Sequence, residues 1–417
     1  MPPLFPLLRL SLSQLAYYKS RYLIMGLLLV SGSTILFLSL SYLVSIQASI
    51  REGLVSRLTG HLQLYNPAVK EVSFYQDPPG QIPWIQDPEA LERILTGMPG
   101  LAGFTKRILV GGLLQKGDRS MGALLAGMEM NKEIALRGKI SPLSLSGMIP
   151  IREGEVLLGK GVAKVLRVAP GEKIPLLVPN ESGFISGRRF LVRGLFSTPG
   201  LDPVAELFVY LNLSDLQHLL GLEKEVGHFV LFAEKETRIN SLTASLAHRF
   251  KALHLPVSLF TWDEIGKPFL GILSLSQIFF GLTNLLILII IALTVVNSTL
   301  MNLFDRMPEL GTLLTLGTKR TQLFVFLGGE IILFGSAATL AGLFLGWMLS
   351  TLLGQWGLPA LNPAMAMAFG QERLYFKTNI WVWLLSFGVS FLFLVLSVGV
   401  PISRACRLNP AEVLKER

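Results

Sequence analysis

Long stretches of the chain contain almost no charged residues. The uncharged stretches are residues 22–50, 268–304 and 378–403, and Glu330 is the only Asp, Glu, Lys or Arg within residues 321–371. A helix needs about 20 predominantly apolar residues to cross the hydrocarbon core of a bilayer. The pattern therefore predicts four transmembrane helices. The alternative, four buried helices in a large soluble core, is disfavoured because runs of this length leave no polar face for water.

The second uncharged stretch is longer than one membrane crossing requires. Residues 268–304 comprise 37 positions, which as a continuous helix would extend about 55 Å, against a hydrocarbon core of about 30 Å. We expect its outer half to stand above the membrane as a stalk. The first span is expected to continue as a helix over residues 47–58, so that two rigid supports carry the segment between them.

Between these two spans, short apolar runs alternate with Gly and Pro, which is typical of mixed α and β structure. The predicted strands are Leu62–Tyr65, Ile108–Leu114, Ser120–Ala126, Glu155–Leu158, Lys173–Val178, Arg189–Leu195, Glu206–Tyr210, Phe229–Ala233 and Val257–Phe260. The predicted helices are Pro88–Thr96, Gly161–Arg167, Leu213–Leu219 and Arg238–Leu253. The predicted fold class is therefore a membrane α-helical protein with four transmembrane helices, in which a large extracytoplasmic α+β domain of two lobes is inserted between helices 1 and 2.

The distribution of charge predicts the orientation in the membrane. The chain has 37 basic and 28 acidic residues, a formal net charge of +9. Basic residues gather beside the spans, within residues 9–21, 306–320 and 404–417, and such flanks favour the cytoplasmic side. Both termini are thus expected in the cytoplasm and the large domain outside, and the charge is attributed to topology rather than to nucleic-acid binding. A single cysteine, Cys406, excludes a disulfide within the chain.

The predicted organisation divides the chain into nine segments. They are a cytoplasmic interfacial helix at 1–20, transmembrane helix 1 at 21–46, the extracytoplasmic domain at 47–267, the stalk and transmembrane helix 2 at 268–304, a short cytoplasmic helix at 305–320, transmembrane helix 3 at 321–351, an external loop at 352–378, transmembrane helix 4 at 379–402 and a cytoplasmic tail at 403–417.

Catalytic motifs find little support in the sequence. Gly154–Gly161 fits the first part of a phosphate-binding loop, but Gly161 stands where Ser or Thr would hold Mg²⁺, and Glu155–Leu158 has the pattern of a strand. The five histidines lack the spacing of a zinc site. We therefore expect a non-catalytic chain that binds no metal and no cofactor of its own.

Glu330 is a candidate site residue because a carboxylate within a membrane span is often functional. The alternative, which we favour, is that Glu330 anchors the third span against a neighbour. Along the same span, Ala338, Gly342, Gly346 and Ser350 recur every fourth residue. Small residues at this spacing allow helices to approach closely, and we interpret them as a packing surface.

The segment between the second and third spans predicts a short amphipathic helix that ends at Gly317. Its apolar residues are Leu310, Leu313, Leu314 and Leu316. Such a helix either rests on lipid headgroups or docks into another protein, and the second interpretation makes it a coupling helix.

At these residues the sequence resembles the permeases of the MacB, FtsX and LolC/LolE group of ABC transporters. The residues that carry the resemblance are Arg306, Glu309, Leu310, Gly311, Leu313, Leu316, Gly317 and Glu330, with Asp305, Thr315 and Thr318 as mild departures. A pattern around Gly154–Lys173 also resembles the external domain of that family, and the ending around Arg407, Pro410 and Leu414 resembles its tail. Each motif is loose alone, but their order along nearly the whole chain is specific.

The resemblance implies an inner-membrane permease subunit with a periplasmic domain. It implies a separate ATPase dimer that binds ATP and Mg²⁺, and a second permease, either a copy or a paralogue. The residues expected to contact the ATPase are Arg306, Glu309, Leu310, Gly311, Leu313, Leu314, Leu316, Gly317, Lys319 and Arg320, with a tail contact at Arg407, Pro410 and Leu414.

The resemblance also implies a function on the outer side of the membrane. The segment after Gly60 is most similar to permeases that release lipoproteins toward a periplasmic acceptor. MacB-like efflux of peptides or amphiphiles and FtsX-like transmembrane signalling are the alternatives within the family. A membrane-anchored structural or sensor protein without an ATPase is the alternative outside it.

Overall fold

The computed structural model describes residues 19–72, 82–140, 149, 151–196, 207–235, 238–306, 312, 315, 318, 320–361 and 373–405. The chain forms two compact units. The membrane unit comprises Met1–Ser45, Ser274–Leu358 and Leu374–Arg417, and the sheet unit comprises Ile46–Leu273 and Pro359–Arg373. Most of the predicted interfacial helix at 1–20 and of the predicted tail at 403–417 lies outside the described residues.

Four long helices build the membrane unit. They are α2 (Lys19–Gly53), α10 (Lys267–Asp305), α12 (Arg320–Trp356) and α14 (Ile380–Ala405). The end of α2 and the start of α10 belong to the sheet unit. The segments long and apolar enough to cross a membrane are Tyr22–Ser56, Ser274–Asp305, Phe326–Trp356 and Ile380–Gly399. The four predicted spans are therefore confirmed by length and composition. All four helices contribute side chains to one apolar cluster, which includes Leu29, Val295, Ile331 and Leu394.

The stripe of small residues on α12 packs against α2. A Cβ atom added at Gly342 would lie 2.0 Å from Ser33 Oγ and 2.4 Å from the carbonyl oxygen of Val30, and one at Gly346 would lie 3.0 Å from Phe37 Cβ. Thr34 Oγ1 donates a hydrogen bond of 2.9 Å to the Gly342 carbonyl. The absence of side chains thus lets the two helices approach closely enough for hydrogen bonds between them. This packing agrees with the interpretation made from the spacing.

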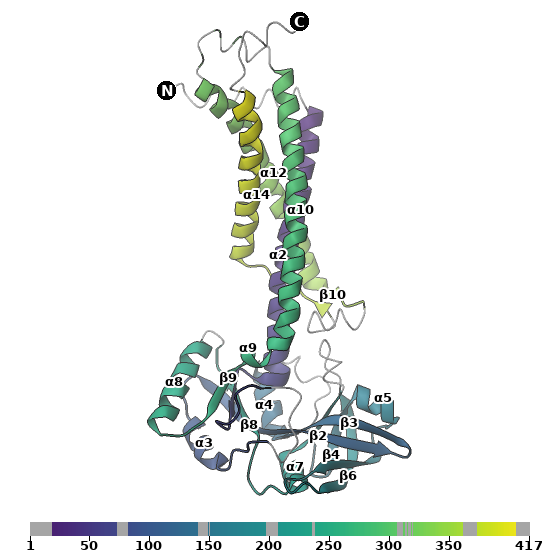
Figure 1. Ribbon diagram of the computed structural model, residues 1–417. Coiled ribbons are helices and arrows are strands. Elements are labelled where there is room, and N and C mark those ends of the chain that lie inside the picture. Colours follow the sequence, from purple (N-terminus) through teal and green to yellow (C-terminus); the bar gives the residue numbers. More distant parts are fainter. Residues whose placement is uncertain are drawn as a thin grey trace. The chain divides into compact units, whose positions relative to one another are not determined.

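The sheet unit is built on a nine-stranded sheet (Figure 1). Its strands are β1 (Leu62–Tyr65), β2 (Leu101–Lys116), β3 (Arg119–Met128), β4 (Glu155–Gly159), β5 (Lys173–Pro179), β6 (Ile185–Phe196), β7 (Phe208–Asn212), β8 (His228–Ala233) and β9 (Ser258–Thr261). The order is β3-β7-β4-β6-β5-β2-β8-β1-β9, with an additional β2–β3 pairing. That pairing closes the first six strands into a ring, and the other three extend from the first half of β2. Because β2 pairs with β8 over 101–107 and with β5 at 113–114, it belongs to both parts.

Short helices cover the strands, and their apolar faces supply part of the core. They are α3 (Pro88–Leu95), α4 (Met130–Ile140), α5 (Lys160–Leu166), α7 (Leu213–Leu220), α8 (Ile239–Ala252) and α9 (Trp262–Ile265). Leu91 of α3, Leu216 of α7 and Leu246 of α8 are all buried in the same cluster as the strand residues. A two-stranded pair, β10 (Leu358–Pro359) and β11 (Arg373–Leu374), falls in the predicted external loop.

The chain enters and leaves the sheet at neighbouring strands. After α2, a π-helical turn, η1 (Leu54–Thr59), leads to Gly60, whose φ of +64° favours glycine. A Cβ atom there would lie only 2.4 Å from Val230 Cγ1. Strand β1 then pairs with β9, with Leu62 opposite Thr261. The segments before β1 and after β9 therefore join the sheet at neighbouring strands.

Most predicted elements of the sheet unit correspond to observed ones, and the differences have physical reasons. Helix α4 was not predicted, because Glu133 and Arg137 interrupt the apolar pattern of its buried face, which also carries Met130 and Leu136. Strand β2 is longer than predicted at both ends, because its polar and glycine positions still pair with β8 and β3. Glu155–Gly159, within the apparent phosphate-loop motif, is strand β4, as its pattern predicted.

Candidate functional site

Polar side chains from three spans meet inside the membrane unit. Glu330 of α12 is 5% exposed, and Arg306, which directly follows α10, is 4% exposed. Arg306 Nη1 lies 3.1 Å from Glu330 Oε2, and Nη2 lies 3.3 Å from Oε1. Tyr22 of α2 donates a hydrogen bond of 2.8 Å to Glu330 Oε1, and Asn302 Nδ2 of α10 donates one of 2.9 Å to the Tyr22 oxygen. We call these four residues the polar cluster.

The geometry of the polar cluster is that of a paired and hydrogen-bonded buried charge. Two parallel N–H···O contacts between a guanidinium and a carboxylate are the strongest arrangement available to such a pair. An ionised group in an apolar interior is tolerated only with partners of this kind. Glu330 therefore fastens α12 to the end of α10 directly and to α2 through Tyr22, which is the arrangement expected of an anchoring carboxylate.

The sequence singled out only half of this cluster. Arg306 was named for its place in the coupling motif and Glu330 for its place within a span, but their pairing was not foreseen. Tyr22 and Asn302 were missed. Their signals were weak: a tyrosine at the charged boundary of the first span, and an asparagine one helical turn before Arg306 in an apolar run.

The predicted coupling residues lie mostly outside the described part of the chain. Besides Arg306, the structure describes the backbone of Arg320, the first residue of α12. Thr312 and Thr315, between the predicted leucines, are helical and exposed. The predicted contacts outside the described residues are Glu309, Leu310, Gly311, Leu313, Leu314, Leu316, Gly317, Lys319, Arg407, Pro410 and Leu414. Their role stays a prediction, and so does that of Arg306 and Arg320 in binding an ATPase.

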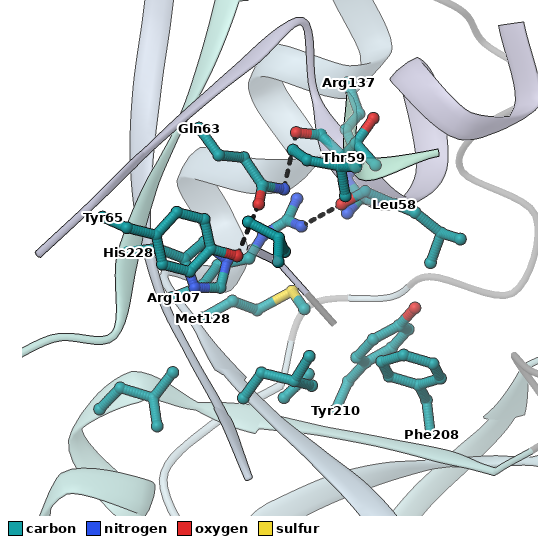
Figure 2. Close-up of a pocket in the computed structure, with 15 residues that line it drawn as sticks. Leu58, Thr59, Gln63, Tyr65, Arg107, Met128, Arg137, Phe208, Tyr210 and His228 are labelled. Carbon is teal, nitrogen blue, oxygen red and sulfur yellow. Dashed lines mark hydrogen bonds between the residues drawn. The ribbon is translucent and has the colours of Figure 1, made fainter. Parts of the chain in front are cut away.

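A second buried polar site lies in the sheet unit, at a pocket of about 50 Å³ (Figure 2). Its lining includes Arg107, Arg137 and His228. Burial, and secondarily the nearby Arg107 guanidinium, lower the pKa of His228 to about 3, so this imidazole is neutral at physiological pH. Among the described residues no group of three or more His, Cys, Asp or Glu side chains could hold a metal ion.

Comparison with known proteins agrees with the membrane unit and with the resemblance. Residues 281–410 match the family model described as FtsX-like permease C-terminal. The chain is 23% identical over 338 residues to the "Lipoprotein-releasing system transmembrane protein LolC" of Xylella fastidiosa, covering 76% of this chain and 78% of that protein. It is 22% identical over 354 residues to the "Lipoprotein-releasing system transmembrane protein LolE" of Haemophilus influenzae, covering 80% of this chain and 82% of that protein.

A likeness to a solved structure is weaker. The crystal structure of the periplasmic region of MacB from Actinobacillus actinomycetemcomitans is 16% identical, covers 51% of this chain and 94% of that chain, and has a TM-score of 0.35.

Four apolar helices and an α/β unit, with an ion pair buried among three of the helices, define a multi-pass membrane protein. Residues 281–410 match the FtsX-like permease family, and the chain over more than three quarters of its length is similar to the LolC and LolE permeases.

Proposed function

We propose that this chain is the permease subunit of an ABC transporter that releases lipoproteins from the inner membrane toward the outer membrane. A separate ATPase dimer binds and hydrolyses ATP with Mg²⁺ in the cytoplasm, and a second permease copy or paralogue completes the assembly. Both termini lie in the cytoplasm and the sheet unit lies in the periplasm. The relatives named as lipoprotein-releasing proteins support this cargo, because they cover more than three quarters of the chain.

The polar cluster is the observation that carries the proposed coupling. Arg306 belongs to the coupling motif and is also bonded to Glu330, so a displacement of the predicted coupling segment acts directly on α12. Tyr22 and Asn302 connect the same pair to α2 and α10. A directional, buried set of hydrogen bonds holds three helices in one geometry, because each alternative leaves a polar group unpaired in an apolar environment. The three spans therefore move together when the ATPase dimer closes.

The length of the helices supports the transfer of this movement. Helix α10 is continuous over 39 residues, about 58 Å at 1.5 Å per residue. Helix α2 is continuous over 35 residues. Both exceed the thickness of a hydrocarbon core. A rigid element that exists in two positions is the physical requirement for coupling between distant sites.

The docking of the ATPase is tested by copurification. Leu313→Asp and Leu316→Asp place charges on the apolar face of the predicted coupling helix, and we expect the ATPase to be lost from the purified permease. The matched control is Thr315→Asp, because Thr315 is exposed on the same segment, and it should retain the ATPase. Undiminished copurification in both leucine variants would favour the sensor or structural protein and refute the proposal.

The cargo is tested in proteoliposomes that contain the permease, its ATPase and a membrane-anchored lipoprotein. ATP should move the lipoprotein into the soluble fraction when a periplasmic acceptor is present. Export of a soluble peptide with no release of lipoprotein would instead support MacB-like efflux.

A further inference from the structure

A buried carboxylate in the sheet unit accepts hydrogen bonds from three side chains, two on β2 and one on α4. Glu133 of α4 is fully buried. It accepts bonds from Arg107 Nε at 2.5 Å and Nη2 at 3.0 Å, from Arg137 Nε at 2.7 Å and from Thr105 Oγ1 at 2.7 Å. Burial alone would raise the pKa of Glu133, but the guanidiniums of Arg107 and Arg137 hold it well below its usual value. Glu133 is therefore a fixed anion that orients Arg107.

The third guanidinium nitrogen of Arg107, Nη1, contacts the turn that follows α2. Arg107 Nη1 donates a hydrogen bond of 2.5 Å to the carbonyl oxygen of Leu58, which lies in η1 (Figure 2). The last carbonyls of a helix have no partner within the helix, and a cation near them is favourable. The next carbonyl, that of Thr59, accepts a bond of 2.8 Å from Gln63 Nε2 of β1. Side chains of the sheet thus hold the end of the helical segment by its backbone.

The turn itself has the properties of a joint. A π-helical turn departs from regular α-helical hydrogen bonding and often marks a functional position. The pocket of about 50 Å³ lies directly beside it and is lined by Leu58, Thr59 and Arg107. A cavity of this size has room for a few waters, since one water needs about 10–15 Å³ by this measure. The pocket therefore leaves space into which η1 can shift while Arg107 keeps its bonds.

Arg107 is placed so that a shift of η1 reaches both parts of the sheet. It lies on β2 opposite His228 of β8 and opposite Met128 of β3. Strand β2 is the strand shared by the six-stranded ring and the β8-β1-β9 extension. Glu133 connects the same guanidinium to α4.

We propose that Arg107 is the positioning residue that transmits movement of α2 to the sheet unit, by joining the Leu58 carbonyl to Glu133. This inference rests on the proposed function, since it requires that ATP hydrolysis moves α2. Lysine keeps the charge but has a single ammonium group, which does not bond bidentately to Glu133 and reach the Leu58 carbonyl as well. Arg107→Lys therefore weakens the joint without removing the buried positive charge.

The test uses the full permease–ATPase complex and measures amide hydrogen exchange with and without ATP, together with ATP hydrolysis. In the unmodified complex we expect ATP to change exchange within residues 101–116 and 228–233. In Arg107→Lys we expect this change to be lost while copurification of the ATPase and the rate of ATP hydrolysis are unchanged. The matched control is Arg188→Lys, which alters an ion pair of 2.8 Å with Asp215 in the same unit without touching η1.

Three outcomes would overturn the role of Arg107, and a fourth would overturn the proposed function. If the Arg107→Lys complex keeps the full ATP-dependent change in amide exchange, Arg107 does not transmit the movement and the proposal is overturned. The same follows if Arg188→Lys loses the change equally, because the effect would then be general to ion pairs of the sheet unit. Loss of exchange protection in Arg107→Lys without ATP would mean that the residue is only structural, which also overturns the proposal. If the unmodified complex shows no ATP-dependent change anywhere in the sheet unit, the proposed function itself fails.

Discussion

The polar cluster gives a sharp stability test, because it holds a charged pair in an apolar environment. The perturbations are Glu330→Leu, Arg306→Met and the double variant. Glu330→Leu leaves the Arg306 guanidinium, 4% exposed, facing an aliphatic side chain, and removes the acceptor of the Tyr22 hydroxyl. Breaking a buried pair by removing one partner costs about 3–5 kcal/mol, whereas replacing both partners by apolar groups is often neutral or stabilising.

The two single variants should not be equal. A carboxyl group left alone can become neutral by binding a proton, whereas a guanidinium keeps its charge. Arg306→Met should therefore cost less than Glu330→Leu. The double variant should recover part of the loss, because no charge then remains buried. We expect a coupling free energy of about 1–3 kcal/mol between the two positions, the range found for residues in direct contact.

The assay is the free energy of unfolding of the full chain in detergent micelles, titrated with a denaturing detergent. The matched control is Thr299→Val on α10, the helix that directly precedes Arg306. The Thr299 hydroxyl is buried, and it has no hydrogen-bond partner within the described residues, so its removal should cost little. Additive effects of the two single variants would refute the reasoning, since they would mean that Arg306 and Glu330 do not stabilise each other.

Two further changes probe packing and titration. Gly342→Ala should destabilise the membrane unit by about 1–3 kcal/mol, the usual cost of overpacking, because the added Cβ would meet Ser33 Oγ and the Val30 carbonyl. The control is Gly329→Ala in the same helix, where an added Cβ meets nothing within 4 Å. In the same unfolding assay the control should be neutral or stabilising. Lowering the pH should destabilise the sheet unit below pH 6.5, because the lowered pKa values of His228, about 3, and His61, about 4, mean that the unfolded chain binds protons that the folded one does not. For His228 the loss of unfolding free energy is about 2 kcal/mol between pH 6.5 and 5. His228→Phe keeps the stack on Tyr65 and should reduce the pH slope of the unfolding free energy. An unchanged slope would contradict the lowered pKa of His228.

The sequence was sufficient for the spans because transfer from water to hydrocarbon depends on composition over about 20 residues and little on tertiary context. The sheet strands were also recognisable, since short apolar runs between glycines and prolines leave few alternatives. Helix α4 shows where this reasoning stops. Its inward face places Glu133 and Arg137, one helical turn apart, beside Met130 and Leu136, and charged residues at buried positions interrupt the apolar period that predicts a helix.

The partners of the charged residues were beyond the sequence for a related reason. Arg306 and Glu330 are separated by 24 positions, and Tyr22 and Glu330 by 308. Which donor meets which carboxylate is decided by the packing of helices, and composition does not encode it. The stripe from Ala338 to Ser350 was different, because small residues at a spacing of four define a surface whatever helix lies on it.

The two buried ion pairs are related through α2. Near its start, the Tyr22 hydroxyl donates to Glu330, which Arg306 holds in place. Just after its end, the Leu58 carbonyl accepts from Arg107, which Glu133 holds in place. In both places a directional hydrogen bond to a member of a buried ion pair holds the helical segment. Apolar contacts alone would let the segment slide or rotate at little cost. Helix α2 is about 52 Å long at 1.5 Å per residue, and under the proposed coupling it carries displacement from the first of these hydrogen bonds to the second. Weakening either hydrogen bond, Tyr22 to Glu330 or Arg107 to Leu58, should therefore uncouple ATP hydrolysis from movement of the sheet unit, even where both units stay folded.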